Sequence, residues 1–272
     1  MKNPKITIIT CTLNSEKYLK ETINSVKNQN YQNFEHLFID GGSTDNTISI
    51  IKNEYQNPRL ITGKDESLYD AFNKGLHNAK GRIIGFLNSD DTLTDKHCLT
   101  RIINAFKDNP IDYYCSRMKI FDAKLKNQFS ILGQNPHKPT FKDQLFSSTY
   151  FAHPTYYCKK EIINKVGEYD LNYKVASDID WLYRLEKMTK NFYFDPTPLI
   201  NFRGEVGMAA RKCFTGLKEE FLIRQKYEKL SLHLTIIYCY HFLRRTIRYI
   251  LEKLKLKKII NLSRKIIIKL AP

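Results

Sequence analysis

The chain has 272 residues, of which 42% are hydrophobic and 12% aromatic, a composition that excludes a largely disordered protein and allows one large core or two small ones. Its formal net charge of +16 is uneven, because residues 211–272 carry 16 Lys or Arg against 4 Asp or Glu. A basic end segment of this kind indicates an anionic partner surface, either a membrane or nucleic acid.

Strands and helices alternate through the first third of the chain. Apolar runs that end in polar turns predict strands over 5–13, 34–40, 60–63 and 82–88. Apolar residues at helical spacing predict helices between them, over 15–29, 45–56 and 67–79. This alternation indicates an α/β fold built on a parallel sheet with right-handed crossovers.

The second half of the chain is less regular. Its patterns predict a helix over 94–109, a strand over 112–123, a short element over 142–149, a strand through Cys158, a helix over 160–166, a helix that follows 173–181 and runs to about 190, a strand over 192–194, a rigid turn over 195–198, and helices over 214–230 and 232–270. The sequence shows no internal repeat and no low-complexity tract.

Three of the predicted strands end in polar or acidic residues, at 12–16, 40–45 and 88–91. In a parallel sheet these ends share one edge, so their side chains converge on one site. The strand at 83–88 runs into Asp90 and Asp91, two adjacent acids whose repulsion a cation would offset. A divalent metal with a phosphorylated ligand is plausible there. Considered alone, the two acids favour a solvated turn that caps the helix starting near Leu93, and the rest of the chain reverses this preference.

The order of these segments resembles the family 2 glycosyltransferases, nucleotide-sugar enzymes with the GT-A fold. The resemblance extends over residues 5–203 and rests on the segments TCTLN, FEHLFIDGGSTDNT, SLYDAFNKG, GRIIGFLNSDD, FAHPTYYCKK and ASDIDWLYRL, in that order. The block that ends in NSDD looks most like the subset that assembles bacterial surface polysaccharides. The resemblance implies a mixed, mostly parallel sheet flanked by helices. A GT-A catalytic domain over 1–205 (nucleotide-binding half 1–92, acceptor half 93–205) would precede a basic helical extension over 206–272.

The resemblance also implies a donor site. Many members of the family carry a second acid in the second turn, whereas here Gly41 follows the aspartate, which leaves the base open; a UDP-sugar is favoured. Residues expected to line the base pocket are Cys11, Thr12, Asn14 and Glu16, with Asp40 beside the base or ribose. Asp70 and Asn73 would lie against the nucleoside, and Asp90 near the ribose.

By the same resemblance, Asp91 would hold Mg²⁺ or Mn²⁺, which neutralises the leaving diphosphate and needs only one or two protein carboxylates. Asp178 falls on the position of the general base that deprotonates the acceptor hydroxyl, so a single displacement would invert the anomeric centre. Without the resemblance Asp178 reads as a helix-capping carboxylate, and both roles can coexist. His153 would lie near the acceptor or diphosphate, and 204–212 would form a lid over the donor.

The segment from Leu230 to Leu270 alternates apolar clusters with Lys and Arg, a pattern typical of a basic amphipathic helix on an anionic membrane surface. A helix packed on the catalytic domain with a solvated basic face is the alternative. Nucleic acid is not the predicted partner, because no binding motif accompanies the charge. A lipid-linked saccharide acceptor would suit an enzyme held at the inner face of the plasma membrane.

Two further features support a cytoplasmic location. The six cysteines have no zinc-knuckle or redox-motif spacing, and we expect them to be reduced. The apolar run after Lys5 is too short for a signal peptide, and Leu230–Leu243, the longest uncharged stretch, is shorter than the roughly 20 residues that span a bilayer. We therefore predict a peripheral protein without a spanning segment.

The sequence thus predicts an inverting, metal-dependent glycosyltransferase of the hexosyltransferase type, acting from a nucleotide-sugar donor onto a growing cell-surface saccharide. A nucleotidyltransferase of similar fold would need a triphosphate cradle rich in Gly and basic residues near the first strand, and TCTLNSEKY has none. A non-catalytic membrane or nucleic-acid adaptor is a third possibility, which the intact set of Asp40, Asp91 and Asp178 argues against.

Overall fold

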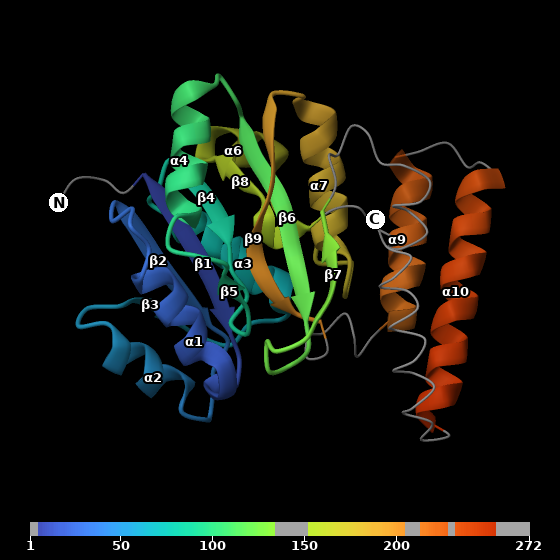
Figure 1. Ribbon diagram of the computed structural model, residues 1–272, viewed down its shortest axis with the longest axis horizontal. Coiled ribbons are helices and arrows are strands. Elements are labelled where there is room, and N and C mark those ends of the chain that lie inside the picture. The colour runs from blue at the N-terminus through green and yellow to red at the C-terminus, as the bar shows by residue number, and fades with distance from the viewer. Residues whose placement is uncertain (1–4, 134–151, 205–212, 228–231, 254–272) are drawn as a thin grey trace.

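The computed structural model describes residues 5–133, 152–204, 213–227 and 232–253. A single mixed sheet runs through the centre of the molecule, with helices on both of its faces (Figure 1). Its strands are β1 (Ile6–Thr12), β2 (Phe34–Asp40), β3 (Arg59–Thr62), β4 (Ile83–Phe86), β5 (Thr92–Leu93), β6 (Tyr113–Phe121), β7 (Gln128–Leu132), β8 (Tyr157–Lys159) and β9 (Phe192–Arg203). The helices are α1 (Glu16–Lys27), α2 (Thr47–Glu54), α3 (Leu68–Asn78), α4 (Cys98–Asp108), η1 (His153–Thr155), α6 (Lys160–Val166), α7 (Ser177–Met188), α9 (Cys213–Tyr227) and α10 (Leu232–Lys253).

The two faces of the sheet follow from the period-two alternation of its strands. On one face, Ile9 and Leu37 pack with α3, α6 and α7 in one buried cluster. On the other face, Ile8 packs with α4, and Phe38 packs with α1 and α2. The core therefore consists of two apolar layers, one on each side of the sheet.

The strand order is β3-β2-β1-β4-β8-β6-β9-β5, and β7 pairs with β6. β1 is parallel to β2 and β4, and β2 is parallel to β3. β8 is antiparallel to both β4 and β6, and β9 is parallel to β6, so β6 and β9 run in the direction of β1. The carboxyl ends of β1, β2, β3, β4, β6 and β9 consequently share one edge, the lower one in Figure 1. The predicted mixed, mostly parallel architecture is confirmed.

The structure differs from the predicted elements in three places. Two strands, β5 and β7, were not predicted, and the helix expected from 94 begins at Cys98. The rigid turn expected over 195–198 is part of β9, whose pairing with β6 shifts register between Ser116 and Met118. The element predicted over 142–149 and the helical pattern after 253 lie outside the described residues.

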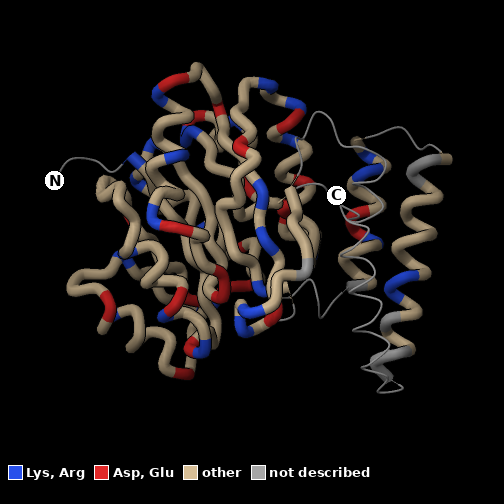
Figure 2. Tube along the Cα trace, viewed as in Figure 1, with Lys and Arg blue, Asp and Glu red and all other residues tan. Residues whose placement is uncertain are grey.

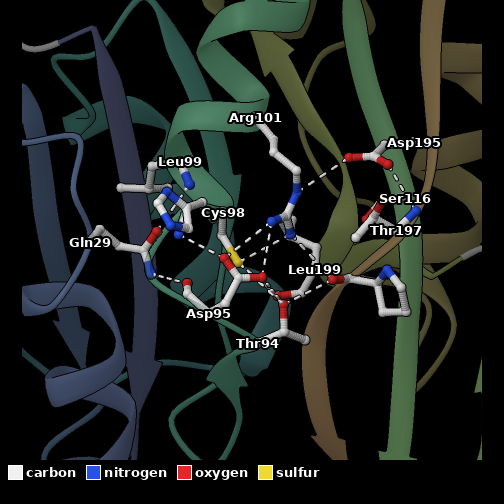
Figure 3. A network of polar contacts seen from close by, with 12 residues as sticks. Gln29, Thr94, Asp95, Cys98, Leu99, Arg101, Ser116, Asp195, Thr197 and Leu199 are labelled. Carbon is white, nitrogen blue, oxygen red and sulfur yellow. Dashed lines mark hydrogen bonds and ion pairs between the residues drawn. The ribbon is translucent and has the colours of Figure 1, made fainter.

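A polar network explains why β9 continues through its two prolines (Figure 3). Arg101 forms an ion pair with Asp195 at 3.4 Å and a hydrogen bond with the carbonyl of Pro198 at 3.3 Å. Tyr114 donates to Asp195 at 2.7 Å, and Thr94 donates to Pro198 at 2.9 Å. These partners, from α4, β6 and the segment before α4, hold the proline segment extended.

The helices α9 and α10 lie beside α7, with α9 between α7 and α10 (Figure 1). None of the described helices combines the length and apolarity that a membrane span requires. Cys98, Cys115 and Cys158 are buried free thiols, Cys11 is a half-buried one, and Cys239 is exposed and also free.

Candidate active site

The turns after β1 and β2 are held together by Asp40, whose side chain is fully buried. One of its carboxylate oxygens accepts hydrogen bonds from the hydroxyls of Thr12 (2.8 Å) and Ser43 (2.6 Å). The other accepts from the backbone N–H groups of Gly42 (3.1 Å) and Ser43 (2.8 Å). Asp40 thus fixes the shape of these two turns, and its predicted contact with the base or ribose stays a prediction.

Asn14 and Glu16 join the same two turns on their exposed side. Asn14 adopts a left-handed backbone conformation (φ 50°), and its amide oxygen accepts from the backbone N–H of Thr44 at 2.9 Å. Glu16 accepts from both the backbone and the side chain of Asn46, at 3.1 and 2.8 Å. Cys11 is half-buried, and burial raises the pKa of its thiol well above the usual value, so it stays neutral.

Asp65, which was not predicted, lies at this edge after β3. A Cβ placed on Gly41 would be 2.8 Å from the Asp65 carboxylate, so the space beside Gly41 is occupied by an acid from the segment after β3. Lys74 pairs with Asp65 at 2.7 Å and with Asp70 at 2.9 Å, and it lowers the pKa of Asp70. The signal was available in the sequence, since β3 is a fourth strand whose end reaches the same edge.

Asn73 faces the protein interior. Its amide nitrogen donates to the carbonyl of Tyr169 at 3.0 Å, and its amide oxygen accepts from the N–H of Tyr169 at 2.8 Å. Both ends of the Asn73 side chain therefore attach the segment that precedes α7 to α3.

The acids after β4 have different surroundings. Asp91 is fully buried, and its two carboxylate oxygens accept from the backbone N–H of Arg203 at 2.9 Å and from the amide of Asn88 at 2.8 Å. Burial, reinforced by the charge of Asp90, raises the pKa of Asp91. Asp90 is only half-buried, and among the described residues no side chain pairs with its carboxylate. Partial burial also raises the pKa of Asp90. Adjacent residues thus present one carboxylate that accepts from two donors and one that no other described side chain engages.

Arg203, at the end of β9, was also not predicted. It is 1% exposed, and its guanidinium donates to the backbone carbonyls of Asp90 and Ala123 and pairs with Glu21. It also lies over the ring of Tyr18, 4.3 Å from the centroid. These contacts fix the backbone of the turn after β4 and leave the Asp90 side chain free to bind a ligand.

Asp178 occupies the first turn of α7. The hydroxyl of Tyr69, on α3, lies 3.0 Å from its Oδ1 and 2.5 Å from the backbone carbonyl of Val175. Burial raises the pKa of Asp178 to about 6, and the Tyr69 hydrogen bond opposes this shift. A carboxylate of this kind accepts protons near neutral pH more readily than an exposed one. Tyr69 was not predicted, because α3 and α7 are far apart in sequence and meet only in the folded protein.

His153 lies in a buried aromatic cluster. Its ring stacks on Phe72 with centroids 5.5 Å apart, and its Nε2 is 2.8 Å from the hydroxyl of Tyr169. Burial lowers the pKa of His153 to about 3, so the ring is neutral at physiological pH. Its predicted contact with the acceptor remains a prediction. The predicted lid over 204–212 lies outside the described residues apart from Gly204.

The acidic residues at this edge of the sheet are the candidate ligands for the predicted metal ion. Among the described residues no group of three or more His, Cys, Asp or Glu side chains could hold an ion. Mg²⁺ and Mn²⁺ nevertheless fit a single accessible carboxylate, because they retain waters and take further oxygens from a diphosphate. Asp90 offers such a carboxylate. Acidic residues gather along this lower edge of the sheet in Figure 2.

Comparisons with known proteins agree with this geometry. The profile of the family described as "Glycosyl transferase family 2" matches residues 7–167. A Mycobacterium bovis (strain BCG / Pasteur 1173P2) protein named PGL/p-HBAD biosynthesis glycosyltransferase is 26% identical over 239 residues, which cover 85% of this chain and 86% of the relative.

Solved structures show the same fold. S. aureus TarS 1-349 in complex with UDP-GlcNAc superposes with a TM-score of 0.62 at 18% identity, covering 88% of this chain and 71% of TarS. Glucosyl-3-phosphoglycerate synthase from Mycobacterium tuberculosis, in complex with Mn²⁺, UDP and glucosyl-3-phosphoglycerate, superposes with a TM-score of 0.59 at 13% identity, covering 84% and 82%.

Proposed function

We propose that this protein, which belongs to glycosyl transferase family 2, transfers a sugar from a UDP-sugar to a saccharide acceptor with inversion at the anomeric carbon. The observation that carries the proposal is Asp178, a half-buried carboxylate with a pKa of about 6 at the start of α7. As the general base, Asp178 takes the proton of the acceptor hydroxyl. The acceptor oxygen then bonds to the anomeric carbon while the bond to the diphosphate oxygen breaks, and UDP leaves with the electron pair.

The leaving group requires a countercharge. A bound Mg²⁺ or Mn²⁺ would stabilise the charge that develops on the diphosphate. We assign the metal-binding role to Asp90 in preference to Asp91, because no described side chain pairs with the half-buried Asp90 carboxylate, whereas both oxygens of Asp91 are engaged inside the protein. Asp91 then acts on the site through Arg203 and Asn88, by fixing the shape of the turn.

The donor base and ribose would lie against the ends of β1, β2 and β3. We propose Cys11 and Asp65 as the nearest groups, with Asp65 in place of the second acid that many relatives carry after the first. TarS, with its UDP-GlcNAc, and the synthase, with its UDP, support uridine.

Isothermal titration with UDP, GDP and dTDP, each with and without Mn²⁺, tests the donor class. We expect UDP to bind tightly only with Mn²⁺, because without the metal the diphosphate lies beside uncompensated acids. If GDP were the only one of the three nucleotides to bind, the protein would still be a transferase, but its donor would be a GDP-sugar. Failure of all three nucleotides would refute the proposed function.

We further propose that the acceptor is lipid-linked and that α10 holds the protein on the cytoplasmic face of the membrane. Apolar side chains recur along α10 at intervals of four, three, four and three, and each is at least 41% exposed: Ile236, Tyr240, Leu243, Ile247 and Ile250. Arg244 and Arg245 lie within the range of this apolar stripe, between Leu243 and Ile247. An exposed apolar stripe beside arginines matches the interface of an anionic bilayer.

Sedimentation with vesicles of phosphatidylglycerol and phosphatidylcholine tests this attachment. The double variant Leu243→Gln with Ile247→Gln should bind about tenfold more weakly, because it removes two apolar side chains from the interface. Met188→Gln, which alters an exposed apolar residue of α7, should bind like the unmodified protein. Equal binding by the double variant would contradict the proposal. If the unmodified protein were a dimer in solution and the double variant a monomer, the stripe would instead be the contact between two copies of the chain.

A further inference from the structure

The segment before α7 is held by a carboxylate from α9. Glu219 accepts hydrogen bonds from the backbone N–H groups of Lys174 (2.9 Å), Val175 (2.9 Å) and Ala176 (3.1 Å). Ala176 is the N-cap of α7 and has no side-chain acceptor of its own. These three donors lie at and before the N-cap of α7, and Glu219 satisfies them from a different helix.

The same segment controls the surroundings of Asp178. Val175 is held on both sides, since its N–H donates to Glu219 and its carbonyl accepts from Tyr69. The Tyr69 hydroxyl also contacts Asp178. A shift of residues 174–176 would therefore move the hydroxyl that contacts the proposed base.

Contacts on either side of Glu219 keep α9 in place. Gly216 lies so close to Val175 that an added Cβ would be 3.1 Å from its side chain. Further along α9, Lys226 and Tyr227 bind Oδ1 of Asp180 at 3.1 and 2.9 Å. Asp180 is 2% exposed, and Arg184 takes its other oxygen at 2.9 Å. The position of Glu219 is thus set by packing before it and by a buried ionic cluster after it.

We propose that Glu219 is a positioning residue for the transfer reaction: it fixes the segment 174–176 that presents Asp178. The inference rests on the proposed function, in which Asp178 is the base. It makes α9, which lies after the matched residues 7–167, a working part of the catalytic unit.

The charged and titratable groups around Asp178 determine whether its pKa rises or falls when one of them is removed. Tyr69 on α3 donates to Asp178 and lowers its pKa, whereas the charge of Glu219 on α9 raises it. Tyr169 also faces Asp178, and burial raises the pKa of its hydroxyl well above the usual value, so it is neutral. Asp180, on α7 itself, is offset by Arg184 and Lys226. Removing the charge of Glu219 should therefore lower the pKa of Asp178, and removing the Tyr69 hydroxyl should raise it.

Carbon-13 NMR of protein labelled at the aspartate carboxyls measures this directly and needs no substrate. The Asp178 signal is the one missing from Asp178→Asn, and we expect its midpoint near pH 6 in the unmodified protein. Glu219→Gln should lower the midpoint by about half a unit, and Tyr69→Phe should raise it. Glu161→Gln, which removes an exposed carboxylate from α6, should leave it unchanged.

Activity completes the test, measured as UDP released from UDP-N-acetylglucosamine with water as the acceptor, whose proton the same base would take. Because the base must be deprotonated, activity should fall below about pH 6, and Glu219→Gln should retain a larger fraction of its activity at pH 5. Glu219→Asp keeps the charge but shortens the reach, so it should lower the rate and leave the NMR midpoint in place. An unshifted midpoint in Glu219→Gln would overturn the inference. Full activity in Asp178→Asn would instead overturn the proposed function.

Discussion

Asp178→Asn should lower the rate of sugar transfer by roughly 10³-fold while leaving donor binding intact. The amide cannot accept the acceptor proton, so the loss should appear in kcat. The Tyr69 hydroxyl can still donate to the amide oxygen at this position, and the fold should be retained. The measurement is UDP release from UDP-N-acetylglucosamine with Mn²⁺ and with water as the acceptor, together with calorimetric titration of UDP.

Asp108→Asn is the matched control, because it makes the same chemical change at an exposed acid at the end of α4. It should keep the rate of the unmodified protein. If Asp178→Asn transferred sugar as fast as Asp108→Asn, another group would have to be the base. If it bound UDP much more weakly, Asp178 would belong to the donor site.

Asp90→Asn and Asp91→Asn should fail in different ways. Asp90→Asn should weaken Mn²⁺-dependent UDP binding at least tenfold, because the metal loses its anionic ligand, while the free energy of unfolding stays unchanged. Asp91→Asn should lower the free energy of unfolding by about 1–3 kcal/mol. Its amide offers one acceptor where the carboxylate meets two donors, the N–H of Arg203 and the amide of Asn88.

Urea unfolding and UDP titration on the same preparations separate the two roles. At a temperature where Asp91→Asn is fully folded, this variant should retain metal-dependent binding of UDP. The opposite pattern, with stability lost in Asp90→Asn and metal-dependent binding lost in Asp91→Asn, would return the metal to Asp91, as the sequence first indicated.

Local patterns were sufficient to predict the first half of the fold. Every strand and helix up to β4 is set by apolar spacing within a short window, and the ends of β1, β2 and β4 carry the expected polar residues. The prediction of a turn at 195–198 was wrong because distant partners, Arg101 above all, override the local preference of the two prolines.

The site residues that escaped prediction depend on contacts between distant segments. Tyr69 meets Asp178 across 109 positions, and the Arg203 N–H meets Asp91 across 112. Nothing in the pair Asp90-Asp91 tells which carboxylate is enclosed, because that depends on where β9 lies. Glu219 was assigned to a basic tail on charge alone, and its partners are backbone groups that no sequence pattern records.

The long reach of Arg203 has a consequence for how the protein is made. The strands β1 to β4 can pair as soon as residue 86 is available, since every partner in these pairings lies within the first 86 residues. The turn at Asp90 and Asp91 is already held by Asn88 and Thr22, but it acquires its contacts with Arg203 only when β9 has been added. During synthesis from the amino terminus, the first four strands therefore wait without the Arg203 contacts until more than a hundred further residues have emerged. The order of translation thus delays completion of the turn at Asp90 and Asp91 until β9 has been made.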